Sequence, residues 1–130
     1  MKASFRDYVS TLRKNDELLE ISKPVDLRDI AALVAQSEKA LLFKNLIGYS
    51  MPVVSGLLQS RNRIALGMGV EYENIAGKLG KAMDKPIKPR RVANAPVKEV
   101  VHTGKKVNLF DLPVPVFSIM DGGPMITAGV

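Results

Sequence analysis

The stretch ALLFKNLIGYSMPVVSGL, residues 40–57, contains two short apolar runs separated by a turn signal. The runs are Ala40–Phe43 and Pro52–Leu57, and Gly48-Tyr49-Ser50 lies between them. Short apolar runs bounded by glycine and proline are typical of buried strands. We therefore expect two strands in this stretch.

Helical patterns precede these strands. Ser4 and Asp7 resemble a capping box, and the apolar residues that follow at helical spacing predict a helix over 5–14. Residues 18–21 predict a strand that ends before Lys23-Pro24, because proline has no N–H for a ladder. Asp26 has the side chain of a good N-cap, so we expect a second helix over 27–39.

A similar alternation follows the strands. Ser60 is expected to cap a helix that carries Ile64-Ala65-Leu66, and residues 71–83 predict another helix that ends at Asp84-Lys85-Pro86. Strands and helices that alternate at short spacing indicate an α/β or α+β domain. We place this N-terminal domain at residues 1–85.

The remaining residues have a different character. Residues 86–96 are rich in Pro and Arg and predict an extended linker. Residues 97–101 and 106–109 flank a turn at 102–105, which predicts a hairpin. Residues 112–115 are expected to be extended, 121–124 to form a turn, and 125–130 to form an apolar strand. Because no turn signal and no polar tail follows this last predicted strand, we expect the domain that begins here to be incomplete.

Composition excludes several classes of protein. Hydrophobic residues make up 46% of the 130-residue chain and charged residues 25%, which is an ordinary globular balance. The absence of cysteine excludes disulfides, thiolate nucleophiles and thiolate-bound metals. The N-terminus lacks the apolar core of a signal peptide, and no apolar run is long enough to span a membrane. These features predict a cytoplasmic protein.

The net charge of +6 is concentrated between Lys78 and Lys106, where Asp84 and Glu99 are the only acidic residues. A basic stretch suits a nucleic acid, another polyanion or an acidic partner, but it is more often a solvated connector. The low aromatic content, 5%, leaves few platforms on which bases of single-stranded nucleic acid could stack.

Two glycine motifs fail as phosphate-binding loops. Gly67-Met68-Gly69 begins a dinucleotide fingerprint, but Tyr72 occupies the third glycine position and the preceding residues predict a helix instead of a strand. The segment Gly77–Lys81 hints at a P-loop, but it lacks the first glycine and the hydroxyl residue after the lysine.

No other residues make a convincing active site. His102 is the only histidine and is expected in an exposed turn, so a two-histidine metal site is impossible within this chain. Asp111 and Asp121 could form a carboxylate pair, but each is better explained as a residue that stabilises its own turn. We therefore assign no catalytic, cofactor-binding or metal-binding residue.

Residues 112–129 carry a specific resemblance. Leu112-Pro113-Val114-Pro115, Asp121-Gly122-Gly123-Pro124 and Ile126-Thr127-Ala128-Gly129 resemble the signature of UbiD-like decarboxylases. The earlier segments 40–45, 52–54, 60–67 and 95–101 are similar to that family in the same order. The chain is thus similar to the N-terminal portion of such an enzyme over nearly its whole length.

The resemblance implies an N-terminal α/β domain followed by the first strands of a split β-barrel that binds flavin, at residues 97–130. It implies a carboxy-lyase that decarboxylates an aromatic or α,β-unsaturated acid reversibly and without oxidation. The implied cofactors are prenylated FMN, a divalent metal such as Mn and potassium, and the implied partners are the remaining decarboxylase polypeptide or a homo-oligomer. Because cofactors of this kind provide the reactive groups for the chemical step, the protein would mainly position them.

The family's Glu–Arg–Glu/Asp catalytic set and its Asn, His and Glu metal ligands lie beyond the equivalent of Val130, so the chain is expected to be inactive alone. Met125 stands where an aromatic residue is usual, and residues 117–120 lack a histidine common in the family. These departures leave the subfamily and the acid open. The alternatives are a non-catalytic assembly or scaffold domain and, less favoured, a basic polyanion-binding module.

Overall fold

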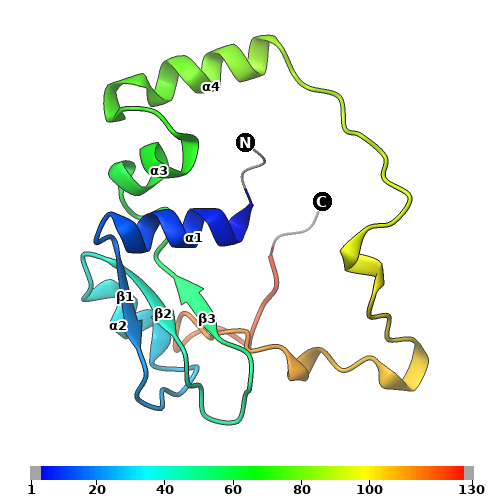
Figure 1. Ribbon diagram of the computed structural model, residues 1–130. Helices are drawn as coiled ribbons and strands as arrows, with labels where there is room; N and C mark the ends of the chain where they lie inside the picture. Colours follow the sequence, from blue (N-terminus) through cyan, green and yellow to red (C-terminus); the bar gives the residue numbers. More distant parts are fainter. Residues whose placement is uncertain (1–3, 128–130) are drawn as a thin grey trace.

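The computed structural model of the chain describes residues 4–127. It contains a three-stranded sheet of order β1-β2-β3, in which β1 and β2 are parallel and β2 and β3 are antiparallel (Figure 1). The strands and the α-helices are β1 Leu18–Ile21, β2 Ala40–Phe43, β3 Val53–Ser55, α1 Phe5–Lys14, α2 Ile30–Ala35, α3 Arg61–Met68 and α4 Ile75–Asp84. The fold is therefore mixed α/β, in agreement with the coarse sequence prediction.

The central strand β2 is covered on both faces. Leu41 and Phe43 point into a cluster that is completed by α2 and by the loop residues Val25 and Leu46. Ala40 belongs to a second cluster with Leu12 of α1, against which residues of α3 also pack. Successive side chains of a strand point to opposite faces, so one short apolar run supplies both cores.

Helix α1 has the predicted boundaries. The Ser4 hydroxyl accepts a hydrogen bond from the N–H of Asp7 at 3.2 Å, and the Asp7 carboxylate accepts one from the N–H of Ser4 at 3.0 Å. This reciprocal pair is the expected capping box. After the C-cap at Asn15, Asp16 adopts a left-handed conformation that turns the chain into β1.

Helix α2 is shorter than the predicted 27–39, and Asp26 is not its N-cap. The Asp26 carboxylate accepts a hydrogen bond from the N–H of Arg28 at 2.9 Å, which folds residues 26–29 into a turn before the helix begins at Ile30. At the other end, Ser37 accepts a hydrogen bond from the N–H of Lys39 and closes a second turn. Side chains that bond to nearby backbone compete with helix formation, and here they do so at both ends.

The predicted helix over 71–83 is a 3₁₀ turn, Tyr72–Asn74, followed by α4. Helix α3 begins after Ser60, whose hydroxyl accepts from the N–H of Asn62 at 3.2 Å, as predicted. Strand β3 is shorter than the predicted 52–57 because the left-handed Gly56 bends the chain away from β2.

The predicted hairpin at 97–101 and 106–109 is wrong. Residues 86–95 contain no helix or strand, and the following segment forms three single 3₁₀ turns at Pro96–Lys98, Gly104–Lys106 and Leu109–Asp111. A strand needs a paired neighbour to satisfy its backbone groups, and among the described residues these apolar segments have none. The expected first barrel strands are therefore not formed as strands within residues 97–127.

Leu112, at the start of the segment 112–115 that was expected to be extended, has extended backbone, and residues 113–118 form no helix or strand. Residues 125–127 form no strand. The rest of the predicted strand over 125–130 lies outside the described residues. No described helix is long and apolar enough to cross a membrane.

Candidate functional site

A groove lies between the N-terminal domain and the C-terminal segment, residues 109–126. It has a volume of about 630 Å³ and is mainly apolar. Its walls come from two regions that are distant in sequence. They are Asp26, Leu27, Arg28, Ile47 and Tyr49 on one side and Leu109, Phe110, Leu112, Val114, Val116, Pro124 and Ile126 on the other.

Nearby residues hold each wall of the groove in position. Val25 pairs with Leu46 in an isolated parallel bridge, and Leu46 pairs with Tyr49, so the loops after β1 and β2 are held together. The C-terminal segment is anchored at Pro113, which is buried, while Val114 to Val116 are half-buried. Proline restricts the backbone to extended conformations, so the segment runs along the domain without folding onto itself.

Asp26 and Arg28 place an ion pair at the edge of this groove. The Asp26 carboxylate accepts hydrogen bonds from Arg28 Nε at 2.9 Å and Nη2 at 2.8 Å, in addition to the backbone N–H. The side-chain hydrogen bonds from Arg28, followed by the backbone one, lower the pKa of Asp26 from 3.8 to about 2. The guanidinium is therefore already engaged by a carboxylate of the same chain.

A second groove of about 830 Å³ continues from the first and shares Arg28 and Val116 with it. Its floor is the small-residue face of α2, and its other wall is the segment 116–123. Asp121 reaches its rim, but its carboxylate accepts from the N–H of Ser118 at 3.0 Å and so stabilises a turn.

The chemistry available in the two grooves is binding by apolar contact. No nucleophile with an adjacent base lines them, and within residues 4–127 no group of three His, Asp or Glu side chains is placed to hold a metal ion. The described residues do not fit the metal of a flavin–metal centre, and we derive no step through one. The grooves suit an apolar polypeptide segment or an aromatic ring.

The structure does not bring the other candidate residues together. His102 is exposed in an irregular segment. The Asp111 carboxylate accepts from Asn108 Nδ2 at 2.7 Å, within the turn that contains it. Asp111 and Asp121 therefore each serve a separate local turn, which agrees with the interpretation favoured from the sequence.

The glycine motifs have structural explanations. Gly67 lies against the ring of Tyr8, where an added Cβ would approach Tyr8 Cε2 to 3.0 Å. Gly69 is the left-handed C-cap of α3. Gly77 and Gly80 are inside α4, so the segment resembling a P-loop is a helix and not a loop.

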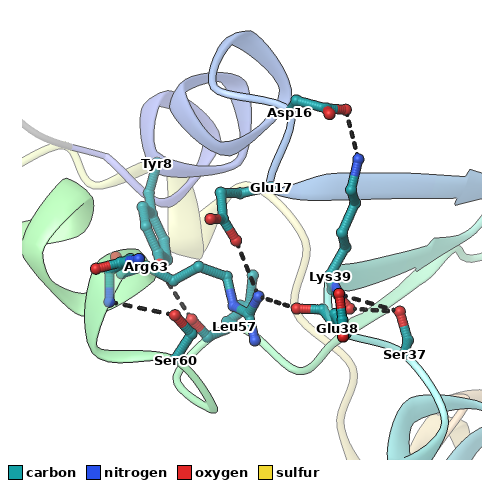
Figure 2. A network of polar contacts seen from close by, with 10 residues as sticks. Tyr8, Asp16, Glu17, Ser37, Glu38, Lys39, Leu57, Ser60 and Arg63 are labelled. Carbon is teal, nitrogen blue, oxygen red and sulfur yellow. Dashed lines mark hydrogen bonds and ion pairs between the residues drawn. The ribbon is translucent and has the colours of Figure 1, made fainter.

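One polar centre was not anticipated from the sequence. Arg63 has a relative exposure of 2%, and its Nη1 donates to Glu17 Oε2 at 3.0 Å and to the carbonyl of Glu38 at 2.7 Å (Figure 2). The Tyr8 hydroxyl lies 2.8 Å from the Leu57 carbonyl and 3.0 Å from that of Arg63, and burial raises the pKa of this tyrosine. The network joins α1, α3 and the turn before β2. An arginine in the first turn of a helix of mixed polarity carries no sequence signal for such burial.

Comparison with known proteins identifies the class. Residues 9–83 match the 3-octaprenyl-4-hydroxybenzoate carboxy-lyase N-terminal domain, and residues 89–130 match the Rift-related domain of the same carboxy-lyase. The chain belongs to the UbiD family, and it contains this N-terminal domain and part of the Rift-related domain.

Individual relatives agree. The chain is 34% identical over 128 residues to anhydromevalonate phosphate decarboxylase of Methanosarcina mazei. The aligned region covers 98% of this chain and 29% of that protein. An evolved dimeric form of the UbiD-class enzyme HmfF from Pelotomaculum thermopropionicum, in complex with prFMN, has a TM-score of 0.86 at 35% identity, over 95% of this chain and 30% of that one. The closed form of vanillic acid decarboxylase from Sedimentibacter hydroxybenzoicus has a TM-score of 0.84 at 27% identity, over 95% of this chain and 29% of that one. The chain thus spans less than a third of the length of these relatives.

Proposed function

We propose that this chain forms the N-terminal domain, at residues 1–85, a linker at 86–96 and the beginning of the flavin-binding domain, at 97–130, of a decarboxylase that uses prenylated FMN. The complete enzyme would remove CO₂ reversibly and without oxidation from an aromatic or α,β-unsaturated carboxylic acid. The reacting groups and the metal ligands would come from polypeptide beyond these residues. The relatives that carry prFMN or are decarboxylases by name support this proposal.

The observation that carries the proposal is the exposure of large apolar side chains in the C-terminal segment. Pro113 is buried against the N-terminal domain, but Phe110, Phe117 and Ile119 on either side have relative exposures of 76%, 60% and 99%. Large apolar side chains that are this exposed within one short segment usually mark an interaction site. The segment is therefore expected to be covered by the rest of a flavin-binding domain.

Within this assembly, the described residues would act by positioning. The core around β2 and the Arg63 network hold the N-terminal domain rigid, and Pro113 fixes where the C-terminal segment leaves it. The bound prFMN would supply the electron sink for decarboxylation, and this chain would orient the polypeptide that binds it.

A chimera tests the proposal. Residues 1–130 would replace the matching N-terminal part of the Sedimentibacter enzyme, and the purified chimera would be assayed for bound prFMN by its absorbance and for CO₂ release from vanillate. We expect both from the chimera and neither from the 130-residue chain alone. The matched controls are the unmodified enzyme and the chimera that carries Ile119→Asp. This substitution places a charge in the surface that the rest of the domain is expected to cover, so we expect that variant to lose prFMN.

A folded, assembled chimera without prFMN would contradict the proposal and favour the scaffold alternative. Circular dichroism and sedimentation of the same sample establish folding and assembly, so a folding failure is recognised separately.

A further inference from the structure

We draw no further inference here: the strongest candidate, the apolar face of helix α4 around the exposed side chains of Leu79 and Met83, carries none because nothing in the structure shows what covers it in a chain that spans less than a third of the length of its relatives.

Discussion

Arg63 donates a hydrogen bond from Nη1 to Glu17 Oε2 at 3.0 Å while its own side chain is almost fully buried. The same nitrogen donates to the carbonyl of Glu38, so one guanidinium joins α3 to the start of β1 and to the turn before β2 (Figure 2). A buried charge is tolerated only where its partners are fixed, and here the two partners come from two separate segments.

Arg63→Ala should therefore be strongly destabilising. It leaves Glu17 and the Glu38 carbonyl without their donor and removes a large buried side chain, so we expect the free energy of unfolding to fall by about 3–5 kcal/mol. Urea denaturation measures this change. Arg61→Ala, in the same helix but on its exposed side, should change it by less than about 0.5 kcal/mol. Similar losses for the two variants would mean that the buried network contributes little.

The same glycine substitution should have opposite effects in α3 and α4. The Tyr8 ring adjacent to Gly67 is held by its hydroxyl contacts with two carbonyls, so Gly67→Ala should cost about 1–3 kcal/mol of stability. Gly77 has open space around its missing Cβ, so Gly77→Ala should stabilise by about 0.5–1 kcal/mol. Thermal unfolding of the two variants is the measurement. A stabilised Gly67→Ala variant would show that the Tyr8 ring can move.

The Asp26–Arg28 pair predicts a dependence of stability on pH. Hydrogen bonds from Arg28 hold the pKa of Asp26 at about 2, below its ordinary 3.8. Because the folded-state pKa is lower, the stabilising contribution is fully present above about pH 4 and is lost as the pH falls towards 2. Carboxyl NMR titration should give a midpoint near 2 that rises towards the ordinary value in Arg28→Ala. Asp7, whose pKa is lowered by its hydrogen bonds with Ser4, should titrate unchanged in that variant and serves as the internal control.

Pro113 should control the C-terminal segment more than the N-terminal domain. Pro113→Gly removes a buried ring and frees the backbone, so residues 109–127 should be cleaved several-fold faster in limited proteolysis. Pro89→Gly, at an exposed position in the segment 86–95, should leave that cleavage rate unchanged. An unchanged rate in Pro113→Gly would mean that other contacts hold the segment.

Local signals were sufficient for much of the fold. The capping box at Ser4 and Asp7, the strand β2 and the Ser60 cap of α3 depend on residues within a few positions of one another, so their patterns could be interpreted directly. The family resemblance from residues 112–129 is confirmed by the comparisons. The predicted hairpin at 97–109 failed because its apolar alternation describes strands whose partners are not among these residues.

The sequence by itself determined the three strands and four α-helices of the N-terminal domain in their order along the chain, because capping, apolar periodicity and turn residues act locally. The family followed from the resemblance of the motifs at residues 112–129. Only the tertiary structure decided that Arg63 is buried, that Gly67 faces Tyr8, and that the loop at Asp26 and the segment around Pro113 form one groove. Those relationships join residues tens of positions apart, and their energies depend on burial and distance, which no local pattern specifies.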